Sequence, residues 1–308
     1  MSKIKINPDK KENIMCLRGE GKTFEFAEEM IKSAGEKVRN NIEKKINAVW
    51  LETSGCFGEV ISLLNAEDPD MIYFLQDLVN MNFFGSINGD QGEKAYERIL
   101  ETINSDEEYI LFISGAIPTK ADGLYTVLAT YKGETITAMD LARRASLKAK
   151  HIISIGTCAS YGGPTAASPN VSDAFSVSEF LQRKDIINIP GCPANPVWTL
   201  GTVGYLINYG SIDLDSEGRP VAFYGETIHS RCPKRKYFDR QIFAEKLGDP
   251  ECMFKLGCRS PITKVYCPIS RWNDSDNWPI GDRTPCIGCA GKGFPDSMEP
   301  FTTYFKKK

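Results

Sequence analysis

The sequence predicts an α/β protein in which a doubly wound parallel sheet is followed by a loop-rich metal-binding segment. Three observations support this fold class. Strand-like apolar runs alternate with helix-like segments from residue 47 to about residue 207, the order typical of a parallel sheet covered by helices. Beyond about residue 215, Gly, Pro, Cys and charged residues replace any long periodic pattern. Seven Cys or His residues fall between positions 229 and 289 of that aperiodic part.

The strands are short apolar runs and the helices follow them after Gly- or Pro-rich turns. The first strand is expected at residues 47–51 (NAVWL), before a turn at Gly55 and Gly58 and a helix that begins at residues 60–64. The other expected strands are 109–113 (YILFI), 151–155 (HIISI) and 186–189, and the other expected helices are 138–148 and about 198–207.

Residues 1–45 are expected to form an N-terminal extension. The stretch FEFAEEMIKSAGEKVRNNIEKK suits a polar helix with apolar residues at Phe26, Met30 and Ile31, which would pack on a surface or a partner. Cys16 is interpreted as a surface or lightly packed thiol. The predicted division is therefore 1–45 for the extension, 46–215 for the sheet domain and 216–308 for the metal-binding domain.

Composition excludes several classes of function. The net charge of −3 over 308 residues argues against a general nucleic-acid binder. No run of eighteen apolar residues exists, so no transmembrane segment is expected. The segment MSKIKINPDKKENIM has no apolar export core and no twin-arginine pair. A cytoplasmic location is the resulting expectation.

The ten cysteines point to metal chemistry, because disulfides are rare in the cytoplasm. Thiolates at this density, with an occasional imidazole, are what iron–sulfur clusters require. Zinc is the main rival, since Cys286-x2-Cys289 or His229-x2-Cys232 alone suits a zinc site. A structural zinc protein therefore stays open as an alternative.

Three further cysteines each follow an expected strand. Cys56, Cys158 and Cys192 come directly after the strands that end near residues 51, 155 and 189. The carboxyl ends of parallel strands meet at one edge of a sheet, where sites of doubly wound proteins gather. The three thiols are thus expected to converge without forming a local motif.

Taken together, the ordered motifs resemble the small subunit of nickel–iron hydrogenases over residues 49 to about 294. The motifs are WLETSGCFGEVISLLN at 50–65, SGAIPT at 114–119, IGTCASYGG at 155–163, IPGCPANP at 189–196, HSRCP at 229–233, GCRSP at 257–261 and NWPIGDRTPCIGC at 277–289. A respiratory quinone-reductase subunit shares the fold, but it would lack the motifs after residue 228. A single Cys-x2-Cys would be weak support, whereas this ordered series is specific.

The resemblance implies a flavodoxin-like first domain and three iron–sulfur clusters. Pro279 stands where the family often has proline in place of a fourth medial cysteine, which implies a 3Fe–4S medial cluster. The proximal and distal clusters would be 4Fe–4S. The implied ligands are Cys56, Glu59, Cys158 and Cys192 for the proximal cluster, Cys267, Cys286 and Cys289 for the medial cluster, and His229, Cys232, Cys252 and Cys258 for the distal cluster.

Glu59 is a departure from the family's usual Cys-x-Gly-Cys motif, which here reads Cys56-Phe57-Gly58-Glu59. The flanking WL and SLLN hold this alignment; a slip that placed Thr53 and Cys56 in the motif would break the match to SLLN. A carboxylate is a harder iron ligand than thiolate, so Glu59 could complete a 4Fe–4S cluster or leave a 3Fe–4S cluster. Alternatively, Glu59 only adds favourable negative charge to the first turn of the following helix.

The implied function is electron transfer between the nickel–iron site of a separate large subunit and an external electron acceptor, in the direction of hydrogen oxidation. Catalytic residues are expected in the large subunit and not in this chain. The expected assembly is a dimer of heterodimers. A regulatory, hydrogen-sensing complex with similar clusters and slow turnover is the alternative that the sequence leaves open.

Overall fold

The structure is a computed structural model that describes residues 23–272, 275 and 277–296. Cys16 and the rest of residues 1–22 of the expected extension lie outside these residues. Five parallel strands form the central sheet: β1 (Ile46–Glu52), β2 (Val79–Phe84), β3 (Tyr109–Ser114), β7 (His151–Ile155) and β9 (Ile187–Ile189). Their order, β2-β1-β3-β7-β9, is the flavodoxin-like doubly wound order. The predicted fold class is confirmed.

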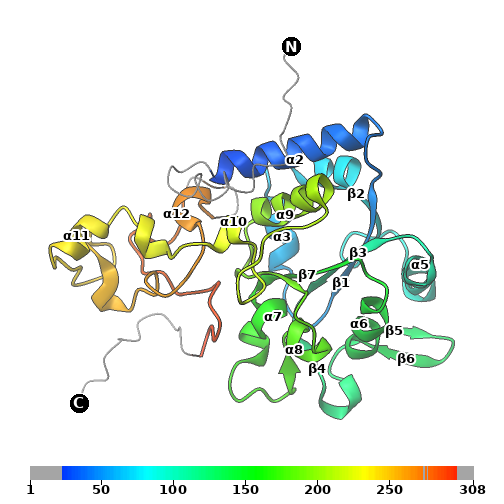
Figure 1. Cartoon of the computed structure of the whole chain (residues 1–308). Coiled ribbons are helices and arrows are strands. Elements are labelled where there is room, and N and C mark those ends of the chain that lie inside the picture. Colours follow the sequence, from blue (N-terminus) through cyan, green and yellow to red (C-terminus); the bar gives the residue numbers. More distant parts are fainter. Residues whose placement is uncertain (1–22, 273–274, 276, 297–308) are drawn as a thin grey trace.

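Helices cover both faces of this sheet (Figure 1). Alternate residues of β3 point to opposite faces, so that Phe112 joins one core and Leu111 the other. One face carries α2 (Thr23–Arg39), α3 (Gly58–Leu64), α4 (Met71–Tyr73), the π-helix η1 (Phe74–Leu78) and α9 (Pro196–Tyr209). The other face carries α5 (Gly92–Asn104), α6 (Ala138–Ser146), α7 (Gly156–Tyr161) and α8 (Val177–Leu181).

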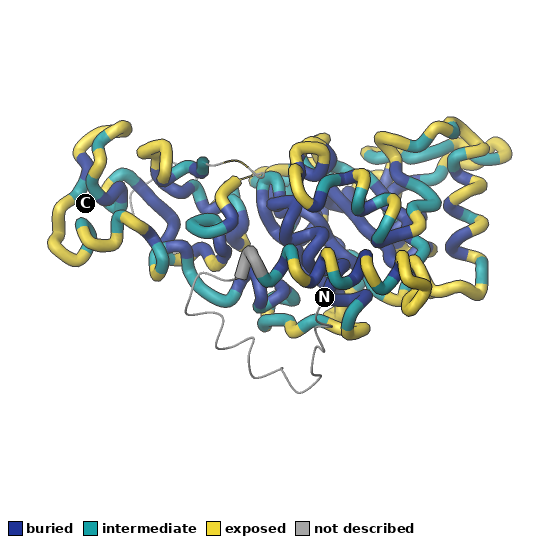
Figure 2. Tube along the Cα trace, turned by 90° about the horizontal axis from the view of Figure 1, so that it is seen from above, coloured by how far each residue is buried: buried dark blue, intermediate teal, exposed yellow. Residues whose placement is uncertain are grey.

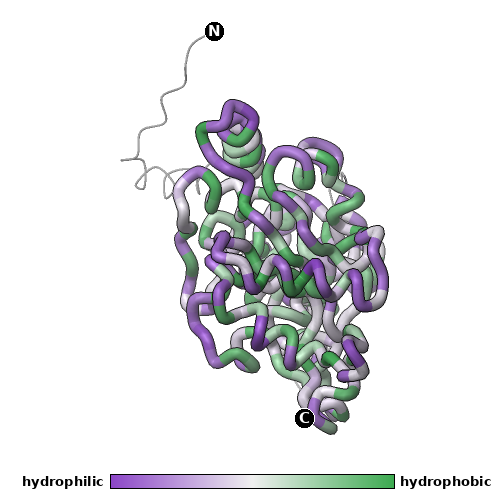
Figure 3. The backbone as a smooth tube through the Cα atoms, turned by 90° about the vertical axis from the view of Figure 1, so that its right-hand side faces the viewer, coloured by the Kyte–Doolittle hydropathy of each residue, from purple (hydrophilic) through white to green (hydrophobic). Residues whose placement is uncertain are grey.

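Helix α5 shows how the outer layer is patterned. It buries Tyr96, Ile99 and Ile103 on one face, at the three- and four-residue spacing of an amphipathic helix. Figure 3 looks at this side of the molecule, where hydrophilic and hydrophobic stretches alternate along the trace. The remaining small elements here are β4 (Ile117–Pro118) paired with β8 (Ala174–Phe175), β5 (Val127–Tyr131) paired with β6 (Glu134–Thr137), and the 3-10 helices η2 (Lys120–Gly123) and η3 (Gly163–Ala166).

The helix expected in the extension packs on the chain's own α9. Ile31 of α2 is fully buried. A Cβ at Gly204 of α9 would lie 3.1 Å from the Ile31 backbone, and one at Gly201 would lie 3.4 Å from the Cβ of Ala27. Because Gly201 and Gly204 have no side chains, the two helices approach closely. Helix α2 is therefore part of the main core.

After α9 the described chain forms only short helices, as the lack of periodicity predicts. They are α10 (Val221–Tyr224), η4 (Ile228–Arg231), α11 (Arg235–Asp239), η5 (Met253–Leu256) and α12 (Cys267–Ser270). The buried core nevertheless continues from the sheet into this region as far as Ala290, and exposed residues dominate its far end (Figure 2). The domain boundaries remain predictions. Among the described residues, no helix is long and apolar enough to cross a membrane.

Candidate iron–sulfur cluster sites

Three cysteines meet at the carboxyl edge of the sheet, as their positions after strands predict. Cys56 follows β1, Cys158 lies in the first turn of α7 after β7, and Cys192 follows β9. The pKa of the Cys192 thiol is raised to about 12, mainly by burial and then by the nearby Cys289, Cys158, Glu59 and Cys56 groups. Cys56 and Cys158 therefore lie within electrostatic range of Cys192.

Close backbone approaches shape this site. A Cβ at Gly58 would lie 3.1 Å from the Cys56 sulfur, and the Gly58 amide donates to that sulfur at 3.3 Å. The Thr165 hydroxyl donates to the Cys158 sulfur at 3.6 Å and to the Ser54 carbonyl at 3.0 Å. Hydrogen bonds to cysteine sulfur stabilise the thiolate, which is the form that binds iron.

Glu59 points from α3 into the same site. Its carboxylate accepts a hydrogen bond of 2.9 Å from the Ala194 amide, two residues after Cys192. Glu59 is also the acidic residue in the first turn of α3, so the alternative of a local role at the start of this helix stays open. Burial raises the pKa of Glu59 to about 8. A Cβ at Gly156 would overlap the Glu59 carboxylate, so a glycine here leaves room for it.

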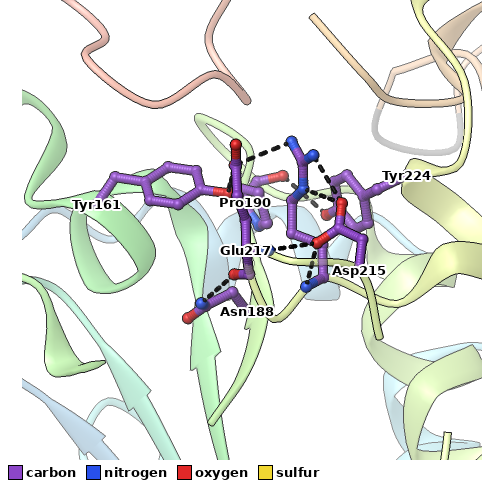
Figure 4. A network of polar contacts seen from close by, with 7 residues as sticks. Tyr161, Asn188, Pro190, Asp215, Glu217 and Tyr224 are labelled. Atoms are coloured by element: carbon purple, nitrogen blue, oxygen red, sulfur yellow. Dashed lines mark hydrogen bonds and ion pairs between the residues drawn. The ribbon is translucent and has the colours of Figure 1, made fainter. Parts of the chain in front are cut away.

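A partly buried polar network contacts the chain just before Cys192 (Figure 4). The Tyr224 hydroxyl donates to the Pro190 carbonyl at 2.8 Å. The Tyr161 hydroxyl donates to Glu217 at 2.7 Å. The Arg219 guanidinium donates to the Asp215 carboxylate at 2.7 and 2.9 Å. This network fixes the backbone carbonyl of Pro190, two residues before Cys192.

The medial cysteines meet where the C-terminal loops return toward the sheet. Burial raises the pKa of Cys286 well above its ordinary value, and the neighbouring Cys258, Cys289 and Cys267 add to the increase. Cys267 begins α12, and the Gly288 amide donates to the Cys286 sulfur at 3.3 Å. The carbonyl of Pro279 accepts bonds from the Thr284 amide and hydroxyl at 2.9 and 2.8 Å, which closes the loop before the Cys-x2-Cys pair.

The distal cysteines are gathered by η4, η5 and the loops beside them. Burial raises the pKa of Cys232 to about 11, and Cys258 and Cys252 raise it further. His229 donates its backbone amide to the Ser260 carbonyl at 3.1 Å, two residues from Cys258.

The His229 ring is held beside this distal group by an aromatic neighbour. It packs edge-on against Phe238, with ring centres 4.5 Å apart. Burial lowers the pKa of His229, and the nearby Arg235 contributes. The imidazole is therefore kept neutral, the form in which it ligates metal.

Backbone amides connect consecutive groups of cysteines. Burial raises the pKa of Cys289. The Cys192 amide partly offsets this rise, because it donates a hydrogen bond to the Cys289 sulfur. At the other junction the Cys286 amide donates to the Cys258 sulfur at 3.4 Å. The Thr157 hydroxyl donates to the Cys289 carbonyl, and the Arg259 amide donates to the Cys286 carbonyl at 2.8 Å. The Cys286–Cys289 segment is thus hydrogen-bonded to the proximal group on one side and to the distal group on the other.

The donor set of the described residues consists mainly of thiols, which suit iron–sulfur clusters and zinc. All nine described cysteines are free thiols. Within the described residues, no three His, Cys, Asp or Glu side chains gather closely enough to hold one ion, whereas tetrahedral zinc needs four ligands about 2.0–2.3 Å from the metal. A cluster is larger and spaces its thiolates further apart. Ligation of clusters stays a prediction, and the structural zinc alternative is not decided by these contacts.

Sequence reasoning missed the hydroxyl and aromatic groups that position these ligands. Thr157 adjoins Cys158 within IGTCASYGG, and Thr165 follows that motif by two residues, yet neither carries a signal of its own. The ring of Phe238 contacts Phe254 at 5.2 Å and Phe243 at 6.0 Å as well as His229. The sequence signal that could have indicated this packing is the occurrence of Phe238, Phe243 and Phe254 between Cys232 and Cys258.

Comparisons with known proteins agree with this geometry. Residues 224–302 match the family model for the C-terminal part of the NiFe/NiFeSe hydrogenase small subunit, and residues 56–206 match "NADH ubiquinone oxidoreductase, 20 Kd subunit". The periplasmic [NiFeSe] hydrogenase small subunit of Desulfomicrobium baculatum is 34% identical over 279 residues, which cover 84% of this chain and 87% of that protein. The hydrogenase-2 small chain of Escherichia coli K12 is 35% identical over 255 residues, covering 80% of this chain and 67% of that one.

Solved structures give the same picture. A [NiFeSe]-hydrogenase structure from Dm. baculatum superposes with a TM-score of 0.80 and covers 84% of this chain and 99% of that chain at 34% identity. The actinobacterial-type NiFe-hydrogenase from Ralstonia eutropha H16 superposes with a TM-score of 0.78 at 26% identity, covering 85% of this chain and 83% of that chain.

Proposed function

The chain belongs to the family of nickel–iron hydrogenase small subunits, the electron-transfer subunits of these oxidoreductases, and we propose that it works in the direction of hydrogen oxidation. A large subunit with a nickel–iron centre is the expected partner. It would split hydrogen into two protons and two electrons, and the chain would relay the electrons to an external acceptor. The observation that carries the proposal is the hydrogen bonding that connects the three cysteine groups in order, through Thr157 to Cys289 and through the Cys286 amide to Cys258.

The ligand sets are those that the sequence implies. Bound iron–sulfur clusters would supply one-electron transfer. The chain's own residues hold the thiols at the site and donate hydrogen bonds to sulfur. Because burial raises the pKa of the Cys192 and Cys232 thiols, these groups must lose protons as iron binds. Assembly is therefore expected to release protons.

The cluster types are part of the proposal. Pro279 in place of a medial cysteine supports a 3Fe–4S cluster at the medial site. Four protein ligands, His229 among them, suit a 4Fe–4S cluster at the distal site. At the proximal site the inward-pointing Glu59 carboxylate supports a 4Fe–4S cluster with one carboxylate ligand. A 3Fe–4S cluster held by three cysteines is the alternative there.

The large subunit is proposed to dock over α3. Phe57, Ile61 and Leu64 are 63%, 54% and 58% exposed, beside the exposed Cys56. Three large apolar side chains on and beside the seven-residue α3 form a patch typical of a protein interface. Covering it would also shield the proximal site from water.

Anaerobic co-purification with the large subunit, followed by a hydrogen-uptake assay, tests this function. A tagged chain is expected to bring a nickel-containing partner and to reduce an electron acceptor under hydrogen at many turnovers per second. Slow turnover together with a bound kinase would instead support the regulatory, hydrogen-sensing complex. A chain that binds no nickel protein would contradict both functions.

Location and assembly complete the proposal. We propose a cytoplasmic location, supported by the cysteine-rich composition, which suits a reducing compartment; the Dm. baculatum relative is a periplasmic protein. Cell fractionation tests the location. We also propose a dimer of heterodimers, which light scattering of the purified complex tests by its mass.

A further inference from the structure

Four exposed basic side chains lie in the segment between Cys232 and Cys258, which also holds the distal Cys252. Lys236 and Arg240 lie in and just after α11, Lys246 lies in the following loop, and Lys255 lies in η5; all four are exposed. We call these four residues the basic surface. The whole chain has a net charge of −3, so a positive surface at this place is a local feature.

Ring contacts join this surface to the distal site. The Lys255 ammonium lies 4.6 Å from the ring centre of Phe243. Phe243 contacts Phe238 at 6.0 Å, and Phe238 contacts His229 at 4.5 Å. The Lys255 ammonium therefore lies beside the same group of aromatic rings that contacts His229, the expected distal ligand.

The nearby carboxylates leave part of this charge unbalanced, because residues 234–255 contain six Lys or Arg and four Asp or Glu, a net charge of +2. Asp239 pairs with Arg235 at 2.7 Å. Asp249 accepts the backbone amides of Glu245 and Lys246 at 3.1 and 3.0 Å. Within the part of the chain that the structure describes, no carboxylate lies within 4.0 Å of the Lys236, Lys246 or Lys255 ammonium groups.

The basic surface also includes exposed apolar side chains, and it lies at one end of the molecule. Ile242 and Leu247 are exposed in the loop between Arg240 and Lys255. Apolar side chains ringed by charge are typical of transient protein interfaces. Helix α11 lies at the end of the molecule opposite α5 (Figure 1), where much of the trace is exposed (Figure 2). A partner can therefore approach it while the face over α3 is occupied.

We propose that the basic surface is the docking site for a small acidic electron-carrier protein. The inference rests on the proposed function and specifies its external acceptor by charge. Opposite charges across such an interface steer the encounter and raise the association rate. The four cations would also disfavour a basic carrier by like-charge repulsion.

Binding to the purified heterodimer tests this proposal. The probe is an acidic two-cluster bacterial ferredoxin, and a basic c-type cytochrome is the opposite probe. Binding is measured by calorimetry at low and at high salt. The Lys236→Glu/Lys255→Glu variant is expected to bind the ferredoxin about tenfold or more weakly, and the wild-type affinity is expected to fall as salt rises.

A matched control is provided by Lys132→Glu/Lys184→Glu. Both lysines are exposed, and the Lys132 ammonium lies 4.9 Å from the ring centre of Tyr131 in the same way that Lys255 lies over Phe243. This control is expected to bind the ferredoxin with wild-type affinity. Equal binding by both double variants, or tighter binding of the cytochrome than of the ferredoxin by the wild type, would overturn the proposal.

Failure of the docking proposal is separable from failure of the proposed function. Hydrogen isotope exchange with water requires no electron acceptor, and it is expected to be unchanged in every variant, as is the iron content. If the wild-type complex catalysed no isotope exchange, the proposed function would fail. If exchange persisted while the ferredoxin bound all variants equally, only the docking surface would be wrong.

Discussion

The sheet region and the C-terminal region hold their cysteines by different means. In the sheet region, Cys56, Cys158 and Cys192 follow parallel strands whose backbone groups are paired along the ladder. In the described part of the C-terminal region, the longest helix, α11, has five residues, and pairing is limited to isolated bridges such as Thr227 with Lys264.

The difference concerns what keeps each region folded. A packed core and a hydrogen-bonded sheet can hold the first region without metal. The C-terminal loops share the buried core but gain few regular hydrogen bonds, so bound clusters are expected to supply much of what holds them folded. We therefore expect the two regions to respond differently to loss of iron and to damage of the core.

Removal of iron is expected to have the largest effect. After anaerobic chelation of the heterodimer, the backbone amides of residues 226–294 should exchange faster. The free energy of opening that protects them should fall by more than about 2 kcal/mol. Strands β1, β3 and β7 should keep most of their protection. Hydrogen exchange followed by mass spectrometry measures both, and an equal loss in the two regions would remove the distinction between them.

Truncation of the sheet core is expected to destabilise the first region instead. Trp50 is fully buried, stacks on Phe84 and Phe112 with ring centres 4.5 and 5.2 Å away, and donates its indole N–H to Ser114 at 3.0 Å. Trp50→Ala should lower the free energy of unfolding by about 3–5 kcal/mol.

The partly exposed Trp272, at 39% exposure, is the control for this substitution. Trp272→Ala should cost less than about 1 kcal/mol, because exposed side chains lose little on truncation. Thermal unfolding of the complex followed by circular dichroism compares the two variants. Equal shifts would mean that the sheet core is not the organiser of the first region.

Substitution at Glu59 is expected to change the proximal site without unfolding either region. Glu59→Cys should alter the EPR spectrum and the midpoint potential of the proximal cluster, because thiolate is a softer and more covalent ligand than carboxylate. Glu59→Gln, which keeps the shape and removes the charge, is the companion variant. An unchanged spectrum and potential in Glu59→Cys would rule out ligation by Glu59.

Loss of the Thr157 hydroxyl is expected to have the smallest effect. Thr157→Val removes the hydrogen bond to the Cys289 carbonyl at the junction of the two regions, which should cost about 1 kcal/mol and shift the medial EPR signal. Thr157→Ser keeps the hydroxyl and should restore the wild-type signal. If serine and valine give the same spectrum, the hydroxyl does not position Cys289.

The sheet region was largely predictable because its signals are local. Apolar runs such as YILFI predicted strands, and positions after strands predicted where Cys158 and Cys192 meet. Strand β2 was missed because Asn80 and Asn82 interrupt its apolar pattern and it lies at the sheet edge. The β5–β6 hairpin was missed although its turn, Lys132-Gly133, has the positive φ angles typical of tight hairpins.

The rest depended on contacts between distant segments. The burial of α2 arises from Gly201 and Gly204 of α9, which no periodicity in α2 could reveal. The grouping of the C-terminal cysteines came from resemblance to a family, since their loops carry no regular pattern. The Cys286 amide reaches Cys258 across 28 residues of chain, and such a bond has no signature in either segment.

The most direct test of the central claim, that the cysteines of both regions hold clusters, is a count of iron and acid-labile sulfide in the anaerobically purified heterodimer. About eleven iron atoms per small subunit, beyond the one in the large subunit, are expected for two four-iron clusters and one three-iron cluster. About ten would indicate a three-iron proximal cluster without a Glu59 ligand. Zinc without acid-labile sulfide would contradict the account.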